Sequence, residues 1–172
     1  MTPSVAKLST PSRVPSLETL VLVGEPIPRP LAENWLKAGT VTVRNGYGQS
    51  KACSMNSTAI PCQSDRSYRN IGNSIWLRYW VVDPHDHDRL MPVGRLSELV
   101  VEGHSVAQGY FAEPEKTKAA FIQNTTWAAD CGAGEDGRRW YKTGDLVQYQ
   151  ENGSLRQKGR PTQGSRAACR GC

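Results

Sequence analysis

The first part of the chain alternates short apolar segments with turn-forming residues. Leu17–Val23 is an apolar run that ends at Gly24, a pattern typical of a buried strand that leads into a loop. Leu31–Lys37 has the spacing of a short amphipathic helix, and Gly39 follows it as a stop signal. Thr40–Val43 is rich in β-branched residues and predicts a second strand. A strand, a helix and a second strand predict the start of an α/β unit.

From Trp76 onward the pattern becomes that of an all-β module with one helix. Pro, Gly and Asp residues separate short segments that predict strands at Trp80–Asp83, Ser97–Glu102 and Asp145–Tyr149. Pro114–Phe121 predicts the helix, because proline stands at its first position and lysines lie further along it. The dipeptide Asn152-Gly153 predicts a tight hairpin between flanking strands. This part of the chain is therefore expected to be mainly β structure.

Composition excludes several classes of protein. Hydrophobic residues make up 38% of the 172 residues, and no apolar run approaches the roughly 18 residues that cross a bilayer, so no membrane partner is predicted. Met1–Leu20 lacks the basic and apolar segments of a secretory signal, which predicts a cytoplasmic protein whose five cysteines are thiols. The net charge of +5 is a mild excess, and no nucleic-acid partner is predicted from it.

The segment Asn45–Lys51 directly follows a predicted strand, where ligands of open α/β sheets commonly bind. Its glycines allow backbone N–H groups to approach a phosphate, Ser50 can donate a hydroxyl hydrogen bond, and Tyr47 offers a flat face for a base. Glycine-rich turns are common, however, and a plain surface turn is the more frequent explanation of such a segment.

Two further segments combine glycine with polar side chains. In Tyr141–Leu146, Asp145 follows a glycine at a predicted turn into a strand, and a carboxylate held there can accept hydrogen bonds from both hydroxyls of a ribose. The alternative is a capped entry into the strand. Val101–Tyr110 carries glycines among alternating apolar residues and predicts a structural β-turn-β element.

The run 83–88 contains two histidines. His85 and His87 lie two residues apart among carboxylates, a pattern that can bind Zn²⁺. A proline in the run favours a solvated turn instead, and a second ligand pair is found only at Cys169 and Cys172 near the C-terminus. No metal site is therefore predicted.

The order of these segments resembles the adenylation domain of nonribosomal peptide synthetases (NRPSs), particularly the fungal type, within the adenylate-forming enzymes. The resemblance covers most of residues 2–160. Tyr141–Leu146 matches the family motif Y-[RK]-T-G-D-L without a mismatch, and Glu98–Tyr110 looks like the motif G-E-L-x-x-x-G-x-x-x-A-x-G-Y. Further matches lie in family order at Thr2–Ala6 with Val14–Glu25, Asn45–Lys51, Asn70–Gly72, Trp80–Pro84, Pro92–Gly94 and Gly159-Arg160.

The resemblance implies a chain of the α/β class, a fragment of the large N-terminal subdomain of an adenylate-forming enzyme. In it, an α/β unit is followed by a small distorted β-barrel, and residues 1–160 form a partial AMP-binding domain. Such enzymes use ATP and Mg²⁺ to convert an amino acid into an aminoacyl adenylate and pyrophosphate. They then pass the acyl group to the thiol of a peptidyl carrier protein (PCP). The implied partners are therefore an amino acid, ATP and a PCP.

The resemblance also implies a partial binding site but no catalytic residue. Tyr47 would stack on adenine, and the Ser50 hydroxyl would contact a phosphate. Asp145 and Arg160 would reach the ribose hydroxyls. The positions that match cofactor-binding positions are Tyr47, Gly48, Ser50, Asp145 and Arg160. The positions near the family's amino-acid pocket are Val21, Val23, Gly46, Ser54 and Met55.

Several departures from the family pattern predict that the chain is inactive alone. Lys51 stands where the family has a glutamate that helps to hold Mg²⁺, and its charge would repel the metal. Gln49 replaces the loop proline, and Ser97 replaces the glycine before Glu98. We also expect three family parts to be missing: the upstream phosphate loop, the aspartate that binds the substrate amino group, and the C-terminal subdomain with its lysine.

Residues 161–172 are predicted to be a disordered tail. The resemblance stops after Arg160, and the following residues lack the apolar alternation of a strand. A shifted reading frame would explain this change, and a natural stop with a short disordered tail is the alternative. Two other functions remain open: a noncatalytic nucleotide-binding or interaction protein, and a metal-binding module built on His85-Asp86-His87.

Overall fold

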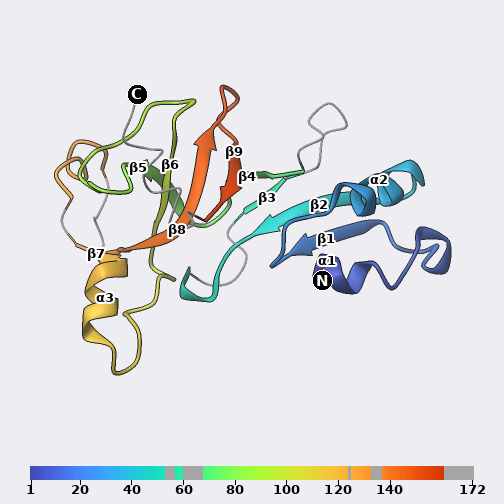
Figure 1. Cartoon of the computed structure of the whole chain (residues 1–172), viewed down its shortest axis with the longest axis horizontal. Coiled ribbons are helices and arrows are strands. Elements are labelled where there is room, and N and C mark those ends of the chain that lie inside the picture. Colours follow the sequence, from blue (N-terminus) through green and yellow to red (C-terminus); the bar gives the residue numbers. More distant parts are fainter. Residues whose placement is uncertain (53–56, 60–67, 124, 133–136, 161–172) are drawn as a thin grey trace. The chain divides into compact units, whose positions relative to one another are not determined.

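The computed structural model describes residues 1–52, 57–59, 68–123, 125–132 and 137–160 (Figure 1). The chain divides into two compact units, Met1–Trp76 and Leu77–Cys172, and each is described by itself. Ser54, Met55 and the predicted tail 161–172 lie outside the described residues. Within the described part of the chain, no helix is long and apolar enough to cross a membrane.

The first unit is a small sheet with short helices. Its elements are α1 (Pro3–Ala6), η1 (Pro11–Arg13), β1 (Thr19–Val23), α2 (Arg29–Lys37), β2 (Thr42–Tyr47), η2 (Ser50–Ala52), β3 (Ser57–Ala59) and β4 (Asn70–Ser74). β1 and β2 are parallel, with Leu20 opposite Val43, and α2 lies between them in the chain. β3 pairs antiparallel with β2, and β4 pairs antiparallel with β3. The predicted strand, helix and second strand are confirmed.

Helix α2 buries its apolar face against the β1–β2 pair. Leu31, Ala32 and Trp35 lie on one face of the helix and are all buried. They form one core cluster with Leu22 and Val43 of the two strands, and no member of this group is more than 8% exposed. Removal of this apolar surface from water stabilises the parallel pair and its crossover helix together.

Strand β2 continues through Tyr47, beyond the end that the sequence predicts at Val43. The prediction of a loop from Asn45 is therefore wrong for its first residues. Their local sequence favours a turn, but β2 has a partner on each side: Gly46 lies opposite Val23 of β1, and β3 pairs with the other edge. Pairing with two neighbouring strands here outweighs the local preference for a turn.

The second unit is an antiparallel sheet that is curled into a half-barrel (Figure 1). Its elements are β5 (Arg78–Val82), β6 (Leu96–Gly103), α3 (Pro114–Ala120), β7 (Phe121–Ile122), β8 (Arg139–Tyr149) and β9 (Leu155–Gly159). β6 pairs with β5 and β8, and β8 also pairs with β7 and β9. The predicted fold class, an α/β unit followed by a small distorted barrel, is confirmed in this form.

Several predicted elements of the second unit correspond to observed ones, but the β-turn-β element expected at Val101–Tyr110 is wrong in its second half, because β6 ends at Gly103 and residues 104–110 form no strand. The segments Trp80–Asp83 and Ser97–Glu102 lie almost wholly in β5 and β6, and Pro114–Phe121 contains α3. The predicted hairpin joins β8 to β9, and Gly153 in its turn has a φ of +78°. Glycine adopts this left-handed conformation without steric cost, which explains why the Asn-Gly dipeptide marks the turn correctly.

Aromatic rings and one ion pair share a core in the second unit. Trp127 stacks on Trp140 with ring centroids 5.3 Å apart and planes at 10°, and Trp80 packs against Trp127 at 4.7 Å. The Glu102 carboxylate is 0% exposed. One of its oxygens accepts a hydrogen bond from Trp80 Nε1 at 2.8 Å, and the other lies 3.7 Å from Arg138 Nη1. These partners offset the cost of burying the charge.

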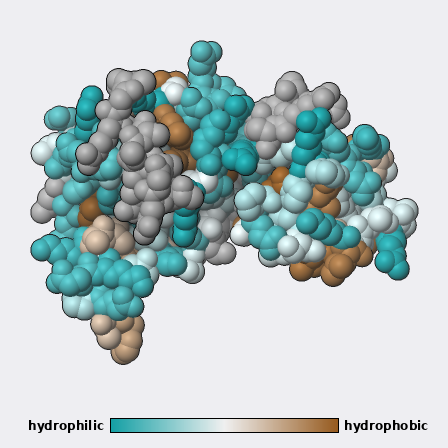
Figure 2. Space-filling view, in the orientation of Figure 1, coloured by the Kyte–Doolittle hydropathy of each residue, from teal (hydrophilic) through white to brown (hydrophobic). Residues whose placement is uncertain are grey.

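The visible surface is mostly hydrophilic, with separate hydrophobic patches (Figure 2). Exposed large apolar side chains include Phe111, which is 99% exposed, and Trp76, which is 84% exposed. Single exposed apolar residues are common on folded proteins. The first unit therefore contains one exposed tryptophan, Trp76, and one buried tryptophan, Trp35, which is 1% exposed.

Candidate functional site

Strand β8 begins at Arg139 and not, as the sequence predicts, at Asp145. The motif Tyr141–Leu146 therefore lies inside a strand instead of at its entry. Pairing with β6 on both sides of the motif keeps this part of the chain extended. Asp145 is consequently held by a sheet rather than by a turn.

The ladder between β6 and β8 is interrupted within this motif. Glu98 lies opposite Leu146, and the next pair joins Val100 to Lys142, so residues 143–145 of β8 face a single residue of β6. Such a bulge leaves residues unpaired, bends the strand and redirects its side chains. The backbone groups inside the bulge therefore need partners other than the ladder.

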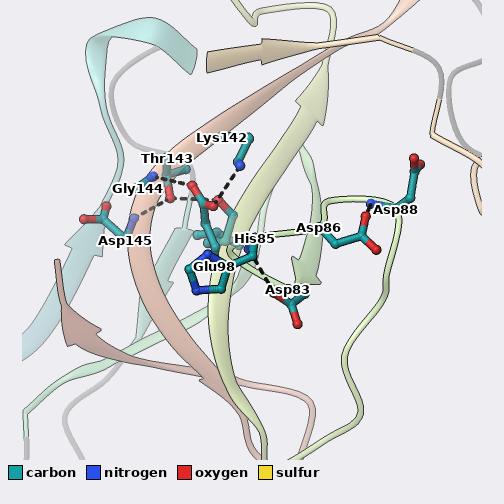
Figure 3. Close-up of polar contacts among 10 residues, drawn as sticks. Asp83, His85, Asp86, Asp88, Glu98, Lys142, Thr143, Gly144 and Asp145 are labelled. Carbon is teal, nitrogen blue, oxygen red and sulfur yellow. Dashed lines mark hydrogen bonds and ion pairs between the residues drawn. The ribbon is translucent and has the colours of Figure 1, made fainter. Parts of the chain in front are cut away.

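Side chains supply those partners (Figure 3). The Thr143 hydroxyl donates to the Leu99 carbonyl at 2.8 Å and accepts a hydrogen bond from the Asp145 N–H at 3.0 Å. The Gly144 N–H donates to Oε1 of Glu98 at 3.1 Å. Gly144 has a φ of +74°, a conformation that glycine adopts most easily. One side chain from each strand thus fixes the backbone that leads into Asp145.

The Glu98 carboxylate is held at both of its oxygens. Oε1 accepts the hydrogen bond from Gly144, and Oε2 lies 3.3 Å from Lys142 Nζ. Glu98 is 8% exposed, and a carboxylate buried to this degree needs such partners to offset its lost hydration. The ion pair with Lys142 therefore also orients Glu98 toward the bulge.

Asp145 presents a nearly buried carboxylate beside an exposed guanidinium. The residue is 6% exposed, and its Oδ1 accepts a hydrogen bond from Arg160 Nε at 3.0 Å. The Arg160 side chain is 71% exposed, so a ligand can reach it from solvent. A carboxylate accepts and a guanidinium donates several hydrogen bonds. The structure thus brings together two residues that the sequence predicts at one ribose, in an arrangement that suits neighbouring hydroxyl groups.

Two tyrosines of β8 have raised pKa values. Burial raises the pKa of Tyr141, and its contact with the Tyr110 hydroxyl, 3.4 Å away, adds to the effect. Burial also raises the pKa of Tyr149, whose hydroxyl donates to the Tyr79 carbonyl at 2.8 Å. Both phenols are therefore neutral at neutral pH and act as hydrogen-bonding groups rather than as charges.

In the first unit, the predicted phosphate and base loop is divided between a strand and a turn. Tyr47 is the last residue of β2, and Ser50 and Lys51 lie in the single turn η2. Tyr47 is 7% exposed, Gly48 and Lys51 are half-buried, and Ser50 is exposed. Of these residues, Ser50 is the most accessible to a ligand in this conformation.

Asn45 anchors the end of β2 to a later segment of the first unit. Its side-chain amide donates to the carbonyls of Tyr68 at 3.3 Å and Asn70 at 2.8 Å. Asn45 is 8% exposed, so these hydrogen bonds satisfy a buried polar group. The first residue of the predicted loop is therefore a structural anchor, a role that the sequence pattern does not reveal.

The structure brings together part of the predicted amino-acid pocket. Val23 and Gly46 are direct partners in the β1–β2 ladder, and Val21 lies two positions earlier on β1. Both valines are half-buried. Ser54 and Met55 lie outside the described residues.

The histidine run forms a turn (Figure 3). The Asp83 carboxylate accepts a hydrogen bond from the His85 N–H at 2.9 Å, and the Asp86 carboxylate accepts one from the Asp88 N–H at 3.1 Å. Carboxylates of turn residues commonly bond to their own backbone in this way. Across the described ranges, no group of three or more His, Cys, Asp or Glu residues could hold a metal ion. The cysteines of the predicted tail lie outside those ranges.

A family of known proteins matches most of the chain. The family described as AMP-binding enzyme matches residues 2–111, which is more than half of the chain. The chain belongs to the AMP-binding enzymes. Among its relatives, the nonribosomal peptide synthetase atnA of Emericella nidulans is 42% identical over 165 residues, a match that covers 93% of this chain and 2% of the synthetase. The predicted resemblance to fungal NRPS adenylation domains is confirmed.

Two solved structures of adenylation domains resemble this AMP-binding chain. The Vibrio cholerae adenylation domain AlmE, in complex with glycyl-adenosine-5′-phosphate, matches with a TM-score of 0.72 at 26% identity, over 92% of this chain and 30% of AlmE. Holo-PA1221, an NRPS protein containing adenylation and PCP domains, matches with a TM-score of 0.73 at 25% identity, over 92% of this chain and 27% of PA1221. The chain therefore corresponds to part of an adenylation domain.

The sequence indicates no role for Glu98 or Thr143 in this part of the AMP-binding fold. The sequence points to Asp145 but not to Glu98 or Thr143, which fix the backbone before it. A hydroxyl residue before Gly-Asp is a recognisable signal, because such side chains often bond to nearby backbone. Glu98 gives no comparable signal, since its partner Gly144 lies 46 positions away in the chain.

Proposed function

We propose that this chain supplies the ribose-binding part of the nucleotide site in an amino-acid-activating adenylation domain. The observation that carries the proposal is the Asp145 carboxylate, which is 6% exposed, is held at a strand bulge and bonds to Arg160. A carboxylate that is already fixed binds without the entropic cost of being ordered. Ribose presents two neighbouring hydroxyls, and such a carboxylate can accept hydrogen bonds from both of them.

Residues of the first unit are proposed to make the remaining contacts. Tyr47 would stack on adenine, and Gly48 and Ser50 would contact phosphate. Because Tyr47 is 7% exposed, stacking requires the atoms that cover its ring to move. The proposed amino-acid pocket consists of Val21, Val23, Gly46, Ser54 and Met55.

The proposed reaction of the intact domain joins an amino-acid carboxylate to the α-phosphate of ATP and releases pyrophosphate. The aminoacyl adenylate bound to AlmE supports this class of product. Transfer of the acyl group to a PCP thiol is supported by the adenylation and PCP domains of PA1221. Biosynthesis of a secondary metabolite and a cytoplasmic location remain predictions.

The residues of the predicted phosphate loop do not fit Mg²⁺. Lys51, in η2, stands at the position of the family's Mg²⁺-binding glutamate, and an ammonium group repels a divalent cation. Lysine is, in contrast, a common ligand of phosphate. We therefore propose that Lys51 contacts phosphate directly.

The 172-residue chain by itself is expected to show no amino-acid-dependent exchange of pyrophosphate into ATP. It spans 30% of AlmE, and catalysis by positioning needs groups from the whole site. Incorporation of labelled pyrophosphate into ATP, measured with each proteinogenic amino acid, tests this expectation, and boiled protein gives the background. Exchange above that background would show that the chain is a complete catalyst and would exclude a noncatalytic nucleotide-binding protein.

Asp145→Ala is expected to weaken adenosine binding by roughly 1.5–3 kcal/mol, because the ribose hydroxyls lose a charged acceptor. Adenosine is a sharper probe than ATP, since removing a carboxylate also reduces its repulsion of phosphate groups. NMR titration of the purified chain suits weak binding and gives the dissociation constants of both proteins.

Two controls accompany this titration. 2′,3′-Dideoxyadenosine lacks both ribose hydroxyls, so Asp145→Ala should leave its affinity unchanged. Asp86→Ala removes an exposed carboxylate from the same unit and should change neither affinity. Equal adenosine affinities of the wild type and Asp145→Ala would remove Asp145 from the site. An equal loss for both ligands would show that the substitution acts on the fold instead.

A further inference from the structure

The Glu98 carboxylate takes the place of a backbone acceptor inside the bulge. More residues of β8 than of β6 lie here, so the ladder cannot supply a carbonyl for every N–H. The Leu99 carbonyl accepts from the Thr143 hydroxyl, and the Gly144 N–H donates to Glu98 Oε1 at 3.1 Å. The Gly144 N–H belongs to the peptide that joins Thr143 to Gly144, so this hydrogen bond fixes the backbone one peptide before Asp145, and the Thr143 hydroxyl accepts from the Asp145 N–H in the next.

We propose that Glu98 is a positioning residue, which holds the Gly144 peptide so that the Asp145 carboxylate stays in place to meet the ribose. This inference rests on the proposed role of Asp145 and adds the group that maintains its geometry. Glu98 is 8% exposed, and its second oxygen lies 3.3 Å from Lys142 Nζ, so its own orientation is fixed. A binding group acts with most precision when neighbouring hydrogen bonds lock it in this way.

Three substitutions separate the hydrogen bond from the charge. Glu98→Gln keeps an oxygen acceptor at the same length without the charge, Glu98→Asp keeps the charge but shortens the side chain, and Glu98→Ala removes both. Adenosine affinity is expected to fall about ten-fold in Glu98→Ala and Glu98→Asp, and much less in Glu98→Gln. Glu113→Ala is the control, because that carboxylate also lies 3.3 Å from a lysine, Lys116, but is exposed and should leave the affinity unchanged.

A signal measured without ligand reports the same geometry. Arg160 Nε lies 3.0 Å from Asp145 Oδ1, so the NMR resonance of the Arg160 Nε–H depends on where that carboxylate lies. Asp145→Ala gives the resonance without the carboxylate. Glu98→Asp and Glu98→Ala are expected to move the resonance toward that value, whereas Glu98→Gln keeps it near the wild-type value. Glu98→Asp and Glu98→Gln still provide the comparison where Glu98→Ala does not fold.

Combining the substitutions completes the test. If Glu98 acts through Asp145, Glu98→Asp causes no further loss of adenosine affinity in the Asp145→Ala background. Additive losses, or a wild-type Arg160 resonance in Glu98→Asp, would overturn the proposal. If Asp145→Ala alone leaves the adenosine affinity unchanged, the ribose-binding proposal fails, and the Arg160 resonance by itself then decides for or against positioning by Glu98.

Discussion

Replacing Trp35 with alanine is expected to lower the free energy of unfolding of the first unit by about 3–5 kcal/mol. Trp35 is 1% exposed and lies in the core cluster that joins α2 to β1 and β2. Its indole N–H has no hydrogen-bond partner in the described structure, so its contribution comes from packing. Removal of the ring leaves a cavity between the helix and the parallel pair that the surrounding side chains fill only in part.

Trp76 provides the matched control for this experiment. It belongs to the same unit but is 84% exposed, so Trp76→Ala should change the free energy of unfolding by no more than about 0.5 kcal/mol. Urea denaturation followed by far-UV circular dichroism measures both variants. Similar losses in Trp35→Ala and Trp76→Ala would contradict the assignment of Trp35 to the core of the first unit.

The strand, helix and strand of the first unit are predictable because their pattern is local. Leu20 and Leu22 alternate with less buried residues, and the apolar side chains of α2 recur at helical spacing, so burial and periodicity agree. The extension of β2 to Tyr47 is not predictable in this way. Asn45 and Gly46 are turn formers by themselves, and they are held extended by strand pairing and by carbonyls that belong to distant residues.

The same contrast applies to the candidate site. Asp145 can be chosen as a candidate from the residues around it, since Gly-Asp after a threonine is a compact local signal. The bulge that holds Asp145 depends on the Glu98–Gly144 hydrogen bond, which joins residues 46 positions apart. The local sequence predicts that β8 begins at Asp145, because the preceding glycine suggests a turn. The sheet instead absorbs that glycine as a bulge within a longer strand.

Arg138→Met is expected to lower the free energy of unfolding of the second unit by about 3 kcal/mol. Glu102 is 0% exposed, and Arg138 Nη1 lies 3.7 Å from its carboxylate, so the substitution leaves a buried charge without that cation. Methionine keeps much of the length and apolar volume of the arginine side chain, which limits the loss of packing. The effect is therefore electrostatic in origin and should respond to a change of charge at Glu102.

Glu102→Gln in the Arg138→Met background tests that origin. A neutral amide oxygen can still accept the hydrogen bond from Trp80 Nε1, so the double variant should regain part of the stability that Arg138→Met loses. Arg29→Met is the matched control: the Arg29–Glu33 pair is shorter, at 2.7 Å, but its side chains are 53% and 33% exposed. Its removal should cost no more than about 0.5 kcal/mol, because solvent screens exposed pairs. A double variant as unstable as Arg138→Met, or equal losses in Arg138→Met and Arg29→Met, would show that burial of the Glu102 charge does not set the stability of this core.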